Sequence, residues 1–212
     1  MVRGTARWTH GERRAGVRSL AFVEQPLDIA PPEPPLSDGV VTLRRWEDAD
    51  APAIAAACRE DEIARWLDQI PQPYTEDDAR AYVRHSRNAW ARSEISNFAV
   101  TDAKSGEVLG AIGARWITRE DGVGEIGYWV KNDARGRGVA SRALVLISRW
   151  AIEQVGARRL QLRADEQNEA SKRVAEKAGF RRETVLRSSH YNSRQRRWVD
   201  FVVYALLPGE LR

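Results

Sequence analysis

The stretch of residues 125–140, E-I-G-Y-W-V-K-N-D-A-R-G-R-G-V-A, constrains the fold of this chain more than any other. Tyr128, Trp129 and Val130 favour a strand, and the polar residues 131–133 end it. A loop rich in arginine and glycine follows, and it leads into a segment whose apolar residues recur on one helical face. The sequence therefore predicts a strand, a glycine loop and a helix in direct succession.

The glycine loop is suited to bind an anion. Where a loop opens a helix, several backbone N–H groups lack a partner, and the helix dipole adds about half a positive charge. Phosphate is the usual ligand of such a place, and Arg135 and Arg137 add forked, positively charged donors. The loop lacks the closing lysine of a P-loop, and Ser141 stands where the dinucleotide-binding G-x-G-x-x-G pattern has its last glycine.

The motif Arg135-x-x-Gly138-x-Ala140 resembles the Gln/Arg-x-x-Gly-x-Gly/Ala signature of the GNAT N-acetyltransferase superfamily. The flanking segments, E-I-G-Y-W-V before it and N-E-A-S-K-R-V-A-E-K-A-G-F at residues 168–180, resemble the Rim-type (RimJ/RimL-like) branch, which acetylates ribosomal-protein N-termini. The resemblance runs from about residue 40 to about residue 207. It implies an α/β (α+β) GNAT fold. We therefore expect a mixed central sheet of about seven strands flanked by helices, with a bulged fourth strand splayed open for acyl-CoA.

The chain of 212 residues suits one domain with an appendage. We expect residues 1–38 to form a flexible N-terminal leader, because they mix arginine, glycine, acidic residues and proline with little apolar pattern. Residues 39–208 are expected to form the GNAT acyltransferase domain. Apolar alternation predicts strands at 40–44, 97–101, 108–118, 159–164, 180–186 and 198–207 besides the one before the glycine loop.

The resemblance assigns the donor-binding residues. In GNAT enzymes the loop holds the pyrophosphate of coenzyme A, which implies this role for Arg135, Gly136, Arg137, Gly138, Val139, Ala140 and Ser141. The pantetheine arm is expected to add like a further strand beside Tyr128, Trp129 and Val130. The resemblance implies contact of Asn168 with coenzyme A, and the residue is also expected to be the N-cap of its helix; the two roles are compatible. Arg173 is either a phosphate ligand or an exposed helix arginine.

Glu125 is the candidate base. An α-amine has a pKa near 7.7–8.0 and a lysine near 10.4, so an α-amine needs little help, and a carboxylate acting through water suffices. In the resemblance, Glu125 occupies the strand position that carries the base in several members. The alternative is a strand glutamate that pairs with an arginine.

Ser171 is the candidate partner of the thioester sulfur. Many GNAT members have a tyrosine acid where this chain has Ala175, whereas Rim-type members have a serine at the place of Ser171. The spacing puts Ser171 on one helical face with Val174, Ala175 and Ala178. Because a hydroxyl is a poor acid near neutral pH, we expect it to polarise the sulfur.

These residues predict an acyl-CoA-dependent N-acyltransferase (EC 2.3.1.-) with acetyl-CoA as co-substrate. The acceptor is a primary amine, above all a protein or peptide N-terminal α-amine, which attacks directly in a ternary complex. Two alternatives stay open. One is acetylation of a small-molecule amine of antibiotic or polyamine type, and the other is a non-catalytic CoA-binding regulatory protein.

Composition limits the other classes. The net charge is +4, and no basic stripe interleaved with aromatic residues indicates nucleic-acid binding. Cys58 is the single cysteine, and His10 and His85 have no metal-ligand spacing, so we expect no metal site. No apolar run approaches the ~18 residues of a membrane span, and we expect a cytoplasmic protein. The apolar strand at 198–207 is compatible with a homodimer.

Overall fold

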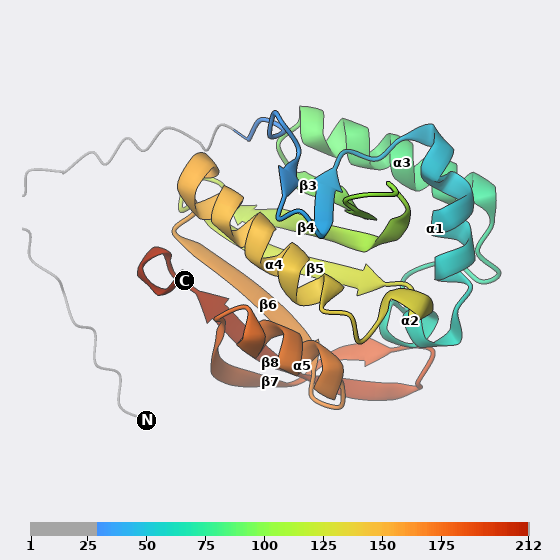
Figure 1. Cartoon of the computed structure of the whole chain (residues 1–212). Coiled ribbons are helices and arrows are strands. Elements are labelled where there is room, and N and C mark those ends of the chain that lie inside the picture. The colour runs from blue at the N-terminus through green and yellow to red at the C-terminus, as the bar shows by residue number, and fades with distance from the viewer. Residues whose placement is uncertain (1–28, 212) are drawn as a thin grey trace, which may run out of the picture.

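A computed structural model describes residues 29–211, and a mixed sheet forms their centre (Figure 1). The sheet has eight strands in the order β1-β2-β3-β4-β5-β6-β8-β7. The strands are β1 (Leu36–Ser37), β2 (Val41–Arg44), β3 (Ile95–Asp102), β4 (Val108–Thr118), β5 (Val123–Val130), β6 (Arg159–Asp165), β7 (Arg181–Asn192) and β8 (Arg197–Leu206). The predicted α/β class is confirmed. The strand beyond the expected seven is the short β1, which pairs with β2 at the edge of the sheet.

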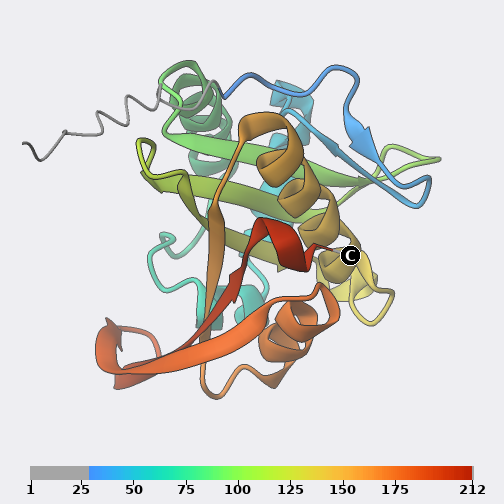
Figure 2. The ribbon, with the colours of Figure 1, turned by 90° about the vertical axis from the view of Figure 1, so that its left-hand side faces the viewer.

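Helices cover both faces of the sheet. They are α1 (Ala51–Cys58), α2 (Asp61–Trp66), α3 (Glu76–Ala91), α4 (Val139–Trp150) and α5 (Glu169–Lys177). One apolar cluster joins α4 to the strands, and a second joins α1 and α3 to the opposite face through Ala99 and Ala111. The two views show α4 on one side of the sheet and α3 on the other (Figures 1 and 2). None of these helices has the length and apolar character that a membrane crossing needs.

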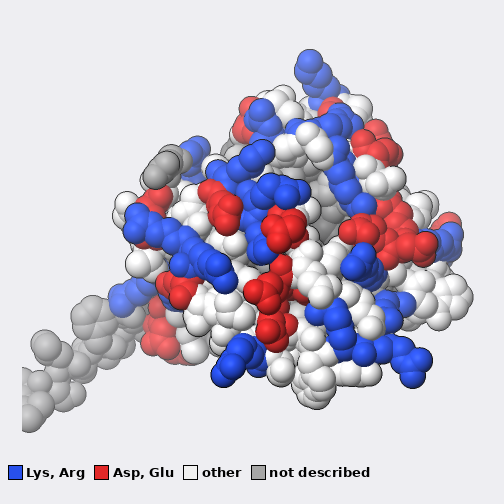
Figure 3. Space-filling view, turned by 90° about the horizontal axis from the view of Figure 1, so that it is seen from below, with Lys and Arg blue, Asp and Glu red and all other residues white. Residues whose placement is uncertain are grey.

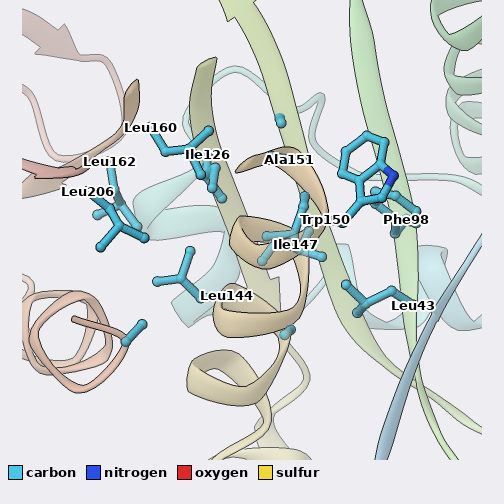
Figure 4. Packing of buried hydrophobic residues seen from close by; sticks show 14 of the residues in the cluster. Leu43, Phe98, Ile126, Leu144, Ile147, Trp150, Ala151, Leu160, Leu162 and Leu206 are labelled. Atoms are coloured by element: carbon cyan, nitrogen blue, oxygen red, sulfur yellow. The ribbon is translucent and has the colours of Figure 1, made fainter. Parts of the chain in front are cut away.

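The core lies between α4 and the sheet. Leu144, Ile147 and Trp150 are each no more than 2% exposed, and they point from α4 towards strand residues such as Leu160 (Figure 4). Trp150 also meets Phe98 edge to face, with ring centroids 5.5 Å apart. The apolar face predicted for this helix therefore packs in the core. This packing holds α4 in position, and with it the glycine loop at its N-terminus.

The sheet opens between β5 and β6. The two strands pair in parallel at three positions, from Val123 opposite Arg159 to Glu125 opposite Gln161. Beyond Glu125, β5 continues to pair with β4, whereas β6 continues with β8. The expected splay of the strand before the loop is thus present. The expected bulge is placed differently: the register shift between β4 and β5 falls at Ile117 of β4, because Trp116 and Thr118 face consecutive residues of β5.

The N-terminal boundary also differs from the expected leader of residues 1–38. Ile29 is 3% exposed and belongs to the core cluster, and Asp38 pairs with Arg142 of α4 at 2.7 Å. Residues 29–38 are therefore part of the folded domain, since an apolar anchor and a sheet edge hold them. The rest of the predicted leader, residues 1–28, lies outside the described residues.

The hairpin of β7 and β8 is longer than predicted. The expected strand at 180–186 continues to Asn192, after a register shift between Leu186 and His190. Ser188 has a φ of 47°, and its N–H donates to Asp200 at 2.7 Å, which stabilises this irregular stretch. The hairpin projects from the body of the molecule (Figure 2). This extension carries His190 towards α2.

Candidate active site

Three cavities surround the splayed end of β5, and Tyr128 lines all of them. The α3-side cavity, about 410 Å³, lies between the sheet and helices α1 and α3. The α5-side cavity, about 340 Å³, lies between β5, the glycine loop and α5. The hairpin-side cavity, about 290 Å³, lies between β6, the β7–β8 hairpin and residues 66–69. Because the sheet opens here, cavities on both faces of the sheet reach the same residue, Tyr128.

The α5-side cavity collects nearly all of the predicted donor residues. Those that line it are Tyr128, Trp129, Val130, Arg135, Gly136, Gly138, Val139, Ala140, Ser141, Asn168, Ser171 and Arg173. Arg137 is exposed and is not among the lining residues. Lys177 lines the cavity one turn beyond Arg173, and sequence reasoning missed it, although i, i+4 spacing on the helix could have indicated it.

The glycine loop has the conformation that its sequence predicts. Gly136 and Gly138 have φ angles of 73° and 78°, in the left-handed region that L-residues other than Gly avoid. Gly138 is the N-cap of α4, and no side chain of the described residues caps the first N–H groups of this helix. A Cβ atom at either glycine would meet nothing of residues 29–211 within 4 Å, so space is open beside the backbone. The first N–H groups of α4 have no partner within the helix, as at any helix start.

Arg135 is fixed by protein groups. Its Nη2 lies 3.1 Å from Glu60 Oε2, and its Nε donates to the carbonyl of Val130 at 3.1 Å. Glu60 also accepts from the N–H of Asn132 at 3.0 Å. Arg135 thus ties the loop to the end of β5 and to the segment before α2, and Glu60 offsets its charge.

A hydroxyl pair marks the boundary between the cavities. Tyr128 Oη lies 2.9 Å from Ser171 Oγ, and either atom could be the donor. Burial raises the pKa of Tyr128 to about 12, although the bond to Ser171 acts the other way. Ser171 is held at the start of α5, where its N–H donates to Asn168 Oδ1 at 3.0 Å. Ala175 of α5 is fully buried. The phenol next to Ser171 is that of Tyr128, which belongs to β5.

Glu125 lies in a network of three donors. Its carboxylate is 2.7 Å from Arg163 Nε, 3.1 Å from Arg115 Nη2 and 3.1 Å from Gln161 Nε2. Burial favours the neutral form. However, the bonds and charge of Arg163, with Gln161 and Arg115, outweigh burial and hold the pKa of Glu125 below its usual range. This is the arginine pairing that the sequence left open as an alternative, and the base role stays a prediction.

A clasp joins the loop after α2 to the β7–β8 hairpin. His190 Nε2 lies 3.1 Å from both carboxylate oxygens of Asp68, and the N–H of Ser193 donates to Asp68 at 3.0 Å. The side chain of Asn192 donates to the carbonyl of Arg65 at 3.1 Å. The ring of His190 stacks on Phe201 at 6.0 Å. The clasp therefore holds the walls of the hairpin-side cavity together.

Charges of both signs lie on the molecular surface (Figure 3). Blue and red side chains intermingle over the face seen from below (Figure 3). Among residues 29–211, no group of three or more His, Cys, Asp or Glu is placed to hold a metal ion. Cys58 is buried, and burial raises the pKa of its thiol to about 11.

Comparisons with known proteins agree with this architecture. The Acetyltransferase (GNAT) domain family matches residues 41–181. The candidate ribosomal N-acetyltransferase YdaF of Bacillus subtilis is 25% identical over 174 residues, which cover 80% of this chain and 92% of that protein. A candidate acetyltransferase of T. thermophilus is 30% identical, with a TM-score of 0.71 over 85% of this chain and 92% of its own. RimJ of Mycobacterium smegmatis, solved in complex with CoA-disulfide, is 22% identical, with a TM-score of 0.74 and 88% of each chain covered.

Proposed function

The chain belongs to the GNAT acetyltransferase family, and we propose that it transfers an acetyl group from acetyl-CoA to a protein or peptide N-terminal α-amine. The observation that carries this proposal is the junction at Tyr128. On one side of it lie the glycine loop and Ser171, and on the other lies the ionised Glu125. A donor and an acceptor bound in these two cavities would meet there.

The α5-side cavity is the proposed site of acetyl-CoA. The N–H groups at the start of α4 would receive the pyrophosphate, and Arg173 and Lys177 add positive charge beside it. Past Glu125, the edge of β5 that faces β6 has no strand partner in the described part of the chain, and the pantetheine amides could pair with it. M. smegmatis RimJ, which shares the fold, was solved with CoA-disulfide bound.

The reaction proposed is direct attack. The amine nitrogen forms a bond to the thioester carbon, the C–S bond breaks, and the electron pair of that bond leaves with the sulfur. Ser171 donates a hydrogen bond to this sulfur, with its hydroxyl oriented by Tyr128. Since a thiol has a pKa of about 8.5 and Tyr128 one of about 12, the phenol does not give up its proton, and the thiolate is finally protonated by solvent.

The depressed pKa of Glu125 favours an α-amine as acceptor. A carboxylate that stays ionised far below neutral pH does not keep the proton that it takes from the amine. It passes this proton on to solvent through a water molecule. At pH 7 the neutral fraction of a lysine amine is roughly 300-fold smaller than that of an α-amine. A weak base of this kind suits the amine that is already partly neutral.

The test is titration calorimetry with acetyl-CoA, followed by free-thiol release across N-terminal peptides, lysine peptides and small amines. We expect binding, and turnover on peptides with a free α-amine but not on the same peptides with a blocked N-terminus. Binding without turnover on any amine would favour the CoA-binding regulatory alternative. Absence of binding would remove the assignment of the α5-side cavity.

A further inference from the structure

The α3-side cavity is walled mainly by apolar and aromatic side chains. They are Ile54, Ile70, Tyr74, Tyr82, Trp129 and Phe201. Trp129 stacks on Trp46 at 6.5 Å, and Trp46 meets Tyr82 at 5.8 Å, so the aromatic part of the wall is packed from behind. Burial raises the pKa of Tyr82 to about 12, and its hydroxyl stays neutral near pH 7. The volume of about 410 Å³ is enough for a small molecule or a large side chain.

Charge is confined to one end of this cavity. The charged residues that line it are Glu125, Arg115 and Arg163, which form the network already described. Two guanidinium groups therefore surround one carboxylate, and the net charge of this end is positive. An amine can approach the carboxylate at this end, but a second cationic group has no acidic partner among the lining residues.

The cavity floor is glycine. Gly127 lies on β5 between Glu125 and Trp129, and strand alternation puts these three residues on the same face. A Cβ on Gly127 would meet nothing of the described chain within 4 Å. A Cβ on Gly113, its partner on β4, would instead lie 2.1 Å from Asn97 Oδ1. The space over Gly127 is thus open to a ligand, whereas Gly113 serves packing.

We infer that this cavity receives the group next to the reacting amine, and that the acceptor is a primary amine with a bulky apolar neighbour. For a peptide, this is an N-terminal residue with a long aliphatic or aromatic side chain. The inference rests on the proposed transferase function and specifies its acceptor. A polyamine or a polycationic antibiotic is a poor ligand, because its further ammonium groups would face either Arg115 and Arg163 or an apolar wall.

The test uses peptides that differ only in the first residue: norleucine, alanine or lysine. Norleucine and alanine differ in apolar volume, and norleucine and lysine differ in one charge at nearly equal length. One methylene in a fitted apolar pocket changes kcat/KM by roughly 10- to 200-fold. We expect norleucine to exceed both others by at least about 10-fold in kcat/KM, and spermidine to be a poorer substrate still. Equal values for the three peptides, or faster acetylation of spermidine, would overturn the inference.

Gly127→Val tests whether the apolar group of the acceptor binds in the space over Gly127. Valine suits a strand and fills the open space, so the preference for norleucine over alanine should shrink at least about 10-fold, with the Kd of acetyl-CoA unchanged. The matched control is Gly209→Val. Gly209 lines none of the three cavities, and a Cβ there also meets no described atom within 4 Å. Thermal unfolding of both variants checks the fold, and Gly127→Ala provides a milder step. An unchanged preference in folded Gly127→Val would contradict the assignment.

Peptide binding to the CoA-loaded protein, measured by calorimetry, separates the two proposals. Tighter binding of the norleucine peptide than of the lysine peptide, without any thiol release, would refute the transferase and support the acceptor cavity. Release of the CoA thiol from acetyl-CoA at equal rates with all three peptides would support the transferase and refute the acceptor cavity.

Discussion

Replacement of Gly138 by alanine should weaken acetyl-CoA binding through the backbone and not through a clash. Gly138 has φ 78° and ψ 7°, and an added Cβ would touch nothing within 4 Å in the described part of the chain. The cost is therefore conformational. A left-handed backbone costs an L-residue about 1–2 kcal/mol, which in a domain of this size lowers Tm by about 2–8 °C if the loop keeps its shape.

The loop can relieve this strain by rotating its N–H groups away from the anion site. A hydrogen bond to a charged group contributes about 1.5–3 kcal/mol, so loss of one such bond to the pyrophosphate weakens binding roughly 10- to 150-fold. We expect Gly138→Ala to show a higher Kd for acetyl-CoA by calorimetry, together with a Tm loss within or below the range above.

Gly106→Ala is the matched control. Gly106 has φ 76° in the turn between β3 and β4, and a Cβ there also meets none of the described atoms within 4 Å. It carries the same backbone strain, and neither it nor its two chain neighbours line the α5-side cavity. Its Tm should fall while the Kd stays constant. If Gly138→Ala binds acetyl-CoA as tightly as the wild type, the anion role of the loop is refuted.

The remaining predictions concern the hydroxyl pair, the base and stability. Ser171→Ala should lower kcat at least about 10-fold with little change in the KM for acetyl-CoA, Tyr128→Phe should do so more weakly, and the double variant should be no worse than Ser171→Ala; additive losses would contradict a shared role. Glu125→Gln should lower kcat/KM about 100-fold, with a smaller deficit above pH 8 where the α-amine is neutral; a pH–rate profile from pH 6 to 9.5 checks this, and a constant deficit would argue for a structural role. Asp50, which is 6% exposed, is bonded by Arg44 at 2.8 Å through both oxygens. Burial is outweighed by Arg44, and the pKa of Asp50 is lowered, so its stabilisation is complete above about pH 4 and is lost as the pH falls through the folded-state pKa. Denaturant unfolding of Asp50→Asn should show a loss of about 2–3 kcal/mol at pH 7 that shrinks below pH 4.

Local signals predicted the centre of the fold well. The β5–loop–α4 unit is encoded by alternation, two glycines and a helical apolar face, all within 30 residues of sequence, and the structure has each of these features where expected. Ile29 gave no such signal, because a single apolar residue near prolines has no period. The length of β7 was missed for a similar reason, since the polar residues 187–192 pair through a bulge that alternation does not reveal.

The contacts of the site were not predictable because they depend on tertiary register. Tyr128 and Ser171 are 43 residues apart, and their contact requires the splay of β5 and the docking of α5. Arg163 reaches Glu125 because Gln161 is its parallel partner, which places the arginine two residues along the neighbouring strand. The pairing of Arg135 with Glu60 spans 75 residues. In each case the residue type was visible, but its partner was not.

The alternation along β5 makes acceptor choice and donor binding separable for protein engineering. Ile126, Tyr128 and Val130 pack with the cluster of α4, whereas Trp129 packs with the cluster of α1 and α3. A saturation library at Gly127, which lines the α3-side cavity and not the α5-side cavity, would therefore sample new amine specificities and leave the residues that line the donor cavity unchanged. Divergence of such enzymes by gene duplication could follow the same every-other-residue route, with few compensating changes required elsewhere.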